Sequence, residues 1–116
     1  MKTLHLTLKR KWFDLIASGE KKEEYREIKP YWEQRFTPTY VLNQNDKPKS
    51  VLHQGFNILL VGNTWDTVTF RNGYAKNAPT IVVQFLGISV GAAKPEWSDN
   101  WQGEVFILKL GEVIKN

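Results

Sequence analysis

Residues 18–26 read Ser-Gly-Glu-Lys-Lys-Glu-Glu-Tyr-Arg, and this stretch is the most informative part of the chain. Gly19 allows the backbone to leave a preceding helix by a tight turn. Glu24 and Arg26 are two positions apart on a segment that we expect to be extended, so their side chains project from the same face. A lysine, a carboxylate and a guanidinium gathered at such a junction can bind a phosphate or the edge of a base, and each changes the protonation of the others. The alternative is an ordinary solvated run of charges.

Hydrophobic periodicity on either side of this stretch predicts two strands and two short helices. Alternating leucines over residues 4–8 indicate a half-buried strand, and apolar residues at helical spacing over residues 12–16 indicate a short core-facing helix that ends near Gly19. Residues 21–28 suit a second strand or an extended arm. Pro30 then occupies a favourable first position for a second helical turn. We therefore expect both helices in the N-terminal third of the chain.

The remaining chain predicts a polar loop followed by β-structure. Residues 37–55 are rich in Asn, Gln, Pro, Ser and Lys, so we expect a variable loop insertion there. Apolar and β-branched runs indicate strands over residues 58–61, 64–71, 80–90 (interrupted at Gly87) and 105–110. The expected fold is α+β: a single domain over residues 1–116, built as a partly closed β-barrel of about five to six strands with two short helices.

Length and composition exclude several classes of protein. The chain has 116 residues, which fits one domain, and it contains no cysteine. A thiol nucleophile, a disulfide framework and a Cys-ligated metal centre are therefore excluded. Residues 1–8 do not resemble a signal peptide, and no run approaches the roughly 20 apolar residues of a membrane span. We expect a soluble, cytoplasmic protein without a membrane partner.

The charge is concentrated near the N-terminus. The formal net charge is +4, and residues 1–36 contribute +3 of it through nine basic and six acidic side chains. So small an excess suits one binding cleft better than an extended nucleic-acid track. Aromatic residues make up 13% of the chain and include five tryptophans, more than a small core needs. The surplus predicts either packing or a surface on which bases stack.

Gly19, Lys21, Glu24 and Arg26 form a Gly-x-Lys-x-x-Glu-x-Arg motif, and with it the chain resembles the ASCH domains, a family related in fold to the PUA domains. Similarity to small bacterial and phage single-domain members continues at residues 12–14, 27–32, 70–74 and 78–80, so it covers most of the chain except residues 37–55. The resemblance implies a PUA-like β-barrel with helices at its side and a cleft into which the motif residues point.

The resemblance also implies a function: binding of RNA or of a modified nucleoside in a cleft that Gly19, Lys21, Glu24 and Arg26 form. Arg71 and Tyr74 flank an Asn72-Gly73 turn together with Lys76, and such groups hold a phosphate while a base stacks. The alternative for this second group is an ordinary hairpin end with a solvated arginine.

Two enzymatic alternatives follow from the same resemblance. Some family members are amidohydrolases that deacetylate N4-acetylcytidine, and at least one group is described as ribonuclease, so the second alternative is a ribonuclease acting on single-stranded RNA. Lys21 matches the catalytic lysine of the amidohydrolases, whereas Glu24 stands where those enzymes have a threonine nucleophile, so Glu24 would orient the lysine or activate water. Their downstream catalytic glutamate has no motif here, and Glu96, Glu104 and Glu112 qualify on residue type alone. A third interpretation is a protein-interaction domain whose charged patch meets another protein.

Three further groups of residues are weaker candidates for a site. Trp97 and Trp101 lie in an expected loop, where they either cap the open end of a barrel or line a stacking cleft. His5 and His53 are far apart and have no Cys or His partners at ligand spacing, so we expect no structural metal. Three carboxylates at Glu23, Glu24 and Glu27 make a poor cation site beside so many lysines. We expect neither a metal nor another cofactor.

Overall fold

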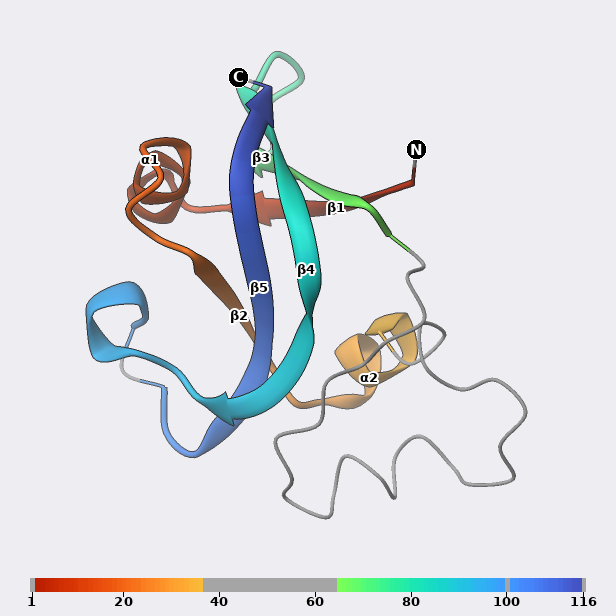
Figure 1. The fold of residues 1–116 in the computed structure, drawn as a ribbon, viewed down its shortest axis with the longest axis vertical. Helices are drawn as coiled ribbons and strands as arrows, with labels where there is room; N and C mark the ends of the chain where they lie inside the picture. The colour runs from red at the N-terminus through yellow and green to blue at the C-terminus, as the bar shows by residue number, and fades with distance from the viewer. Residues whose placement is uncertain (1, 37–64, 100, 116) are drawn as a thin grey trace.

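The computed structural model describes residues 2–36, 65–99 and 101–115 (Figure 1). Within these ranges the elements follow in the order β1 (Thr3–Leu8), α1 (Arg10–Ala17), β2 (Glu23–Glu27), α2 (Pro30–Phe36), β3 (Thr67–Asn72), β4 (Thr80–Ala92), a 3-10 turn η2 (Pro95–Trp97) and β5 (Glu104–Lys115). The loop predicted at residues 37–55 and the strand predicted at residues 58–61 lie outside the described residues.

The five strands form one mixed sheet in the order β1-β3-β4-β5-β2. β1 pairs in parallel with β3, and the other three neighbouring pairs are antiparallel. The sheet curls strongly, so that β1 crosses behind the long β4 and β5 strands in Figure 1. This half-barrel with two short helices in the N-terminal third confirms the expected α+β, partly closed barrel. In this strand order β1 and β2 are the two edges of the sheet.

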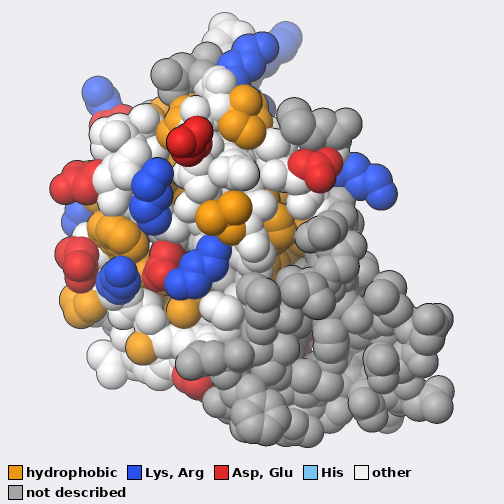
Figure 2. Space-filling model, in the orientation of Figure 1, with side chains coloured by type: hydrophobic (Ala, Val, Ile, Leu, Met, Phe, Trp, Pro, Cys, Tyr) orange, Lys and Arg blue, Asp and Glu red, His pale blue; other side chains and the backbone are white. Residues whose placement is uncertain are grey.

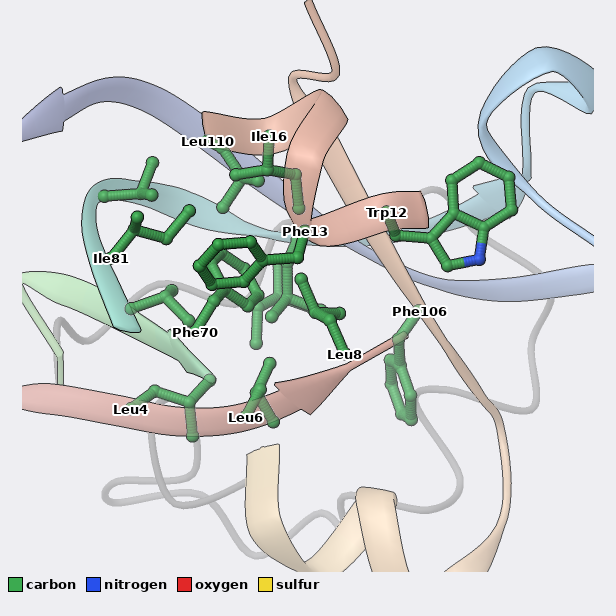
Figure 3. Close-up of a cluster of buried hydrophobic side chains, with 14 of the residues drawn as sticks. Leu4, Leu6, Leu8, Trp12, Phe13, Ile16, Phe70, Ile81, Phe106 and Leu110 are labelled. Atoms are coloured by element: carbon green, nitrogen blue, oxygen red, sulfur yellow. The ribbon is translucent and has the colours of Figure 1, made fainter. Parts of the chain in front are cut away.

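The core forms where α1 covers the concave side of the sheet. Leu4, Leu6 and Leu8 of β1 are buried, as their alternation predicts, and they share one hydrophobic cluster with Phe13 and Ile16 of α1. Figure 3 shows the two α1 side chains among those of β1, β3 and β4. Each large apolar side chain buried in this way contributes about 1.5–3 kcal/mol to stability. This cluster fixes α1, and therefore the chain that leaves it, against the sheet.

The two longest strands differ from the predicted ones. β4 continues through Gly87 to Ala92, because register shifts against β5 between Val83 and Gly87 let the strand bend without ending. β5 continues past Leu110 to Lys115, because its last residues still pair with β4. The Asn72-Gly73 signal marks the end of β3, where Gly73 has a φ of 86°, and opens a longer loop over residues 73–79. None of the helices in the described ranges is long and apolar enough to cross a membrane.

Candidate functional site

A cleft of about 460 Å³ lies between the two edge strands of the curled sheet, and we call it the seam cleft. Its wall is built from residues 7–9 at the end of β1, Trp12 of α1, residues 24–26 of β2, residues 73–74, and residues 97–99 and 101. In Figure 1, α1 and the η2 segment lie on the same side of the β5 strand. The cleft therefore exists because the sheet curls until its two edge strands, β1 and β2, lie near each other without pairing.

A sharp turn after α1 places Lys21 beneath the helix. Gly19 has a φ of 85°, a conformation that costs glycine little, and the amide of Lys21 donates a hydrogen bond back to the carbonyl of Leu15 at 3.0 Å. The chain then enters β2, where Glu24 pairs with Leu108 of β5. The glycine of the motif thus allows the backbone turn that positions the lysine.

Lys21 and Glu24 form a buried ion pair. Nζ of Lys21 lies 2.8 Å from Oε1 of Glu24, and the two residues are 2% and 4% exposed. The same Nζ lies 4.4 Å from the centre of the Trp12 ring, within the range of a cation–π contact. Glu24 lines the seam cleft, whereas Lys21 is absent from the lining and lies behind Glu24. A ligand in the cleft would therefore meet the carboxylate before the ammonium.

Burial lowers the pKa of Lys21. Desolvation lowers the pKa of Lys21 below its ordinary value of 10.5, and nearby Arg26 lowers it further, while the carboxylate of Glu24 opposes both effects. The net direction is downward, because in a site with so little water the charged ammonium loses more solvation than its partner restores. Lys21 therefore releases its proton more readily than a solvated lysine would.

Arg26 joins the two sheet edges. Its Nη2 lies 3.2 Å from Oε2 of Glu24 and donates a hydrogen bond to the carbonyl of Thr7 in β1 at 3.0 Å. The side chains of Glu24 and Arg26 therefore share one face of β2, as their spacing predicted. The guanidinium carbon also lies 5.1 Å from the centre of the Trp32 ring. Among the described residues, Nε of Arg26 is buried without a hydrogen-bond partner.

Asp99 fixes the opposite wall of the cleft to α1. Its Oδ2 accepts a hydrogen bond from Nε1 of Trp12 at 3.3 Å and lies 3.5 Å from Nζ of Lys9. In Figure 3 the Trp12 ring stands at the margin of the core, apart from Phe13. Trp12 is a core residue, as expected, and its ring also belongs to the cleft wall.

Glu23 lies on the other face of β2 and supports the strand. Its Oε1 accepts a hydrogen bond from the hydroxyl of Tyr25 at 2.7 Å, and its Oε2 pairs with Nζ of Lys109. Burial alone would raise the pKa of Glu23, but the hydrogen bonds from Lys109 and Tyr25 outweigh it and hold the pKa below its ordinary 4.5. Because Glu23 and Glu24 are engaged on opposite faces, they do not converge on one cation. In the part of the chain that the structure describes, no group of three or more His, Cys, Asp or Glu residues could hold a metal ion.

The structure brings some of the predicted ligand-binding residues into the cleft and leaves others outside it. Glu24, Arg26 and Tyr74 line it. Lys21 lies behind the lining, and Gly19 is not part of it, because its role is to turn the chain.

Arg71 also lies outside the cleft lining. Its Nη2 donates a hydrogen bond to the carbonyl of Ala75 within its own loop, and it lines a separate hollow that Thr69 and Thr80 also border. The three downstream glutamates considered as catalytic partners, Glu96, Glu104 and Glu112, do not line the seam cleft either. The acidic residue that does line it beside Glu24 is Asp99.

Trp97 and Trp101 are packing residues and cleft-lining residues at once. They pack against the buried cluster of Tyr25, Val105 and Ile107, and they also line the seam cleft. Two tryptophans from this segment and Trp12 thus contribute large rings to one cavity. A residue missed by sequence reasoning is Asp99, which no motif marks.

On the one face of the molecule that Figure 2 shows, the charged side chains do not form a single basic stripe. On the face shown in Figure 2, Lys and Arg side chains are interspersed with Asp and Glu side chains and with apolar groups. The lining of the seam cleft combines two basic residues, Lys9 and Arg26, with two acidic residues, Glu24 and Asp99.

Comparisons of the chain with models of protein families, with curated proteins and with solved structures found no match.

Proposed function

We propose that the chain is an ASCH-type, PUA-like domain whose seam cleft binds the base of a modified nucleoside or of single-stranded RNA. The observation that carries this proposal is the composition of the cleft: a buried carboxylate and a guanidinium lie among large aromatic rings. Small-molecule sites are typically concave, largely apolar, and provided with a few converging polar groups.

The size and the walls of the cleft suit a base. About 460 Å³ falls within the roughly 300–1,000 Å³ of ordinary ligand pockets. Trp12, Trp97 and Trp101 line it, and Tyr74, which is 89% exposed, lies at its edge. Proteins that read single-stranded RNA stack splayed-out bases on such rings, and one stacked base is worth about 1–3 kcal/mol.

The polar groups supply hydrogen bonds of both kinds. An ionised carboxylate accepts at two oxygens with about four lone-pair sites, so Glu24 retains acceptor capacity after pairing with Lys21 and Arg26. Arg26 supplies donors only. Glu24 would therefore accept from an amino or imino N–H of a base, and Arg26 would donate to a ring nitrogen or carbonyl oxygen. The balance of charges inside the cleft favours a neutral group over a phosphate there.

A titration of the wild-type chain at low salt tests this proposal. Cytidine, N4-acetylcytidine, the other common ribonucleosides and a short single-stranded RNA are added separately, and binding is followed by calorimetry. We expect at least one of these ligands to bind. Glu24→Gln should weaken that binding by about tenfold, because the ligand loses one charge-assisted hydrogen bond.

Glu27→Gln is the matched control for that experiment. Glu27 is exposed on the same strand and does not line the cleft, so this substitution removes an equal charge and leaves the affinity unchanged. Absence of binding by every probe would refute the proposed function. An equal loss of affinity in both variants would show that the ligand is held elsewhere.

A second candidate, an amidohydrolase acting on an acylated nucleoside, is favoured by the buried Lys21–Glu24 pair at the base of the cleft. Because Glu24 faces the cleft and Lys21 does not, Glu24 would take a proton from water while Lys21 holds it in position. Water would add to the acetyl carbonyl carbon, the C–N bond would break, and the nucleoside nitrogen would leave protonated together with acetate.

Incubation with N4-acetylcytidine and measurement of acetate tests the hydrolase candidate. Turnover that is lost in Glu24→Gln and retained in Glu27→Gln would support this candidate. If the wild-type chain releases no acetate, the candidate is refuted.

The ribonuclease alternative rests on the resemblance alone. Single-stranded RNA that stays intact with and without manganese would remove it.

A further inference from the structure

A second hollow of about 370 Å³ lies beside the seam cleft, and we call it the α2 hollow. It is lined by residues 5–7 of β1, Arg26 of β2, Tyr74, and three side chains of α2: Tyr31, Trp32 and Arg35. Thr7, Arg26 and Tyr74 line both cavities. A ligand that fills the seam cleft therefore reaches the α2 hollow past Arg26 without leaving the surface.

The two cavities differ in charge. The seam cleft contains two carboxylates, Glu24 and Asp99, which offset its basic groups. The lining of the α2 hollow, as far as the structure describes it, contains the guanidinium groups of Arg26 and Arg35 and no carboxylate. Among the described residues, Arg35 donates a long hydrogen bond from Nη2 to the carbonyl of His5 at 3.4 Å, and a guanidinium has further N–H donors beyond that one. An anionic group is therefore favoured in the α2 hollow and disfavoured in the seam cleft.

Aromatic contacts hold this second site in shape. Trp32 stacks on Phe36 with ring centres 5.4 Å apart, and its own ring lies under the guanidinium of Arg26. Tyr31 meets Trp32 edge to face at 4.7 Å and is nevertheless 60% exposed. Arg26 is thus held between Glu24 on one side and Trp32 on the other. Its orientation is fixed before a ligand arrives, which reduces the entropy lost on binding.

We propose that the α2 hollow binds the phosphate of a nucleotide whose base occupies the seam cleft, an inference that rests on the proposed function. Arg35 and Arg26 would hold the phosphate oxygens, since planar guanidinium groups bind phosphate through paired hydrogen bonds. The ligand class is then a phosphorylated nucleoside, either a free mononucleotide or one residue of a single strand, and not a bare nucleoside.

Affinities of nucleosides and nucleotides for the full chain test this inference. Each common ribonucleoside is compared with its 3′- and 5′-monophosphates, and the best base is compared again as the central residue of a trinucleotide. We expect one monophosphate to bind about tenfold more tightly than its nucleoside, the gain from charge-assisted hydrogen bonds. Arg35→Gln should remove that gain and leave the affinity for the nucleoside unchanged.

Lys115→Gln is the matched control, because it removes the same charge from an exposed lysine that lines neither cavity. Arg35→Lys should retain part of the gain, since it keeps the charge and loses the planar fork. A trinucleotide that binds more tightly than the monophosphate would identify a strand as the source of the phosphate, and equal binding would identify a mononucleotide.

The outcomes separate this inference from the proposed function. If nucleosides bind but phosphate adds nothing, or if the phosphate gain survives Arg35→Gln, the α2 hollow is not a phosphate site and the seam cleft stands. If neither nucleosides nor nucleotides bind, the proposed function fails, and the inference fails with it.

Discussion

Nζ of Lys21 lies 2.8 Å from Oε1 of Glu24, and both side chains are almost fully buried beside a cleft that only Glu24 reaches. The turn at Gly19 makes this arrangement possible by returning the chain beneath α1. A buried ion pair beside a cleft is costly to maintain, because each ion loses its hydration. Its presence at the unpaired seam of the sheet is the strongest structural sign that this seam is a site.

Lys21→Met should destabilise the fold. The substitution keeps an unbranched side chain of similar length but leaves the buried Glu24 with Arg26 as its remaining ionic partner in the described structure. Breaking a buried pair typically costs about 3–5 kcal/mol, and we expect the lower end of that range because Arg26 remains. Denaturant unfolding monitored by circular dichroism measures the change.

Two further variants control the Lys21 experiment. Lys22→Met makes the same chemical change one residue later, at an exposed side chain, and should alter stability by less than about 0.5 kcal/mol. Adding Glu24→Gln to Lys21→Met should restore part of the loss, since the buried carboxylate that lost its lysine is no longer charged, although Arg26 then loses its contact with a charged carboxylate. A Lys21→Met protein as stable as the wild type would contradict the buried pair.

Acid should weaken the fold through Glu23. The pKa of this carboxyl is held below 4.5 in the folded chain, so its stabilising contribution is complete above pH 4.5 and is lost as the pH falls through the folded-state pKa. Glu23→Gln removes the titrating group. The difference in unfolding free energy between the wild type and Glu23→Gln should therefore shrink as the pH is lowered below 4.5.

Urea unfolding between neutral and acidic pH measures this difference. Glu27→Gln changes an exposed neighbour on β2 and keeps Glu23, so its unfolding free energy should fall in acid as that of the wild type does. A wild-type advantage over Glu23→Gln that stays constant across the acid range would show that the contacts of Glu23 with Tyr25 and Lys109 do not depend on its charge.

Trp97→Ala should weaken ligand binding more than it weakens the fold. Its ring lines the seam cleft and packs only against the edge of the smaller hydrophobic cluster. The loss of one stacking surface should lower the affinity for the bound base about tenfold. Trp65→Phe changes a ring that packs between Phe36 and Phe85 and does not line the cleft, so it should leave the affinity unchanged.

Local sequence patterns predicted the parts of this fold that depend on neighbours in the chain. The leucines of β1 alternate, α1 carries its apolar residues at helical spacing, and the two-residue spacing of Glu24 and Arg26 puts them on one face. Each of these features follows from the geometry of a single strand or helix. The expectation of a partly closed barrel followed from the number of such segments.

The contacts that complete the site connect distant positions and left no local signal. Asp99 reaches Trp12 across 87 positions of sequence, and this contact depends on how far the sheet curls. The depth of Lys21 behind Glu24 likewise depends on where α1 rests on the core. Periodicity carries no information on either quantity, which is why Asp99 was missed and Lys21 was expected in the lining itself.

The most direct test of base binding at the seam cleft uses the indole N–H signals of the five tryptophans in a two-dimensional nitrogen–proton NMR spectrum. The ¹⁵N-labelled chain is titrated with the nucleosides, nucleotides and single-stranded RNA named above. We expect the signals of Trp12, Trp97 and Trp101 to shift together on binding, while that of Trp65 stays in place. Binding that moves none of these three signals, or no binding by any probe, would contradict the assignment of the seam cleft as the base-binding site.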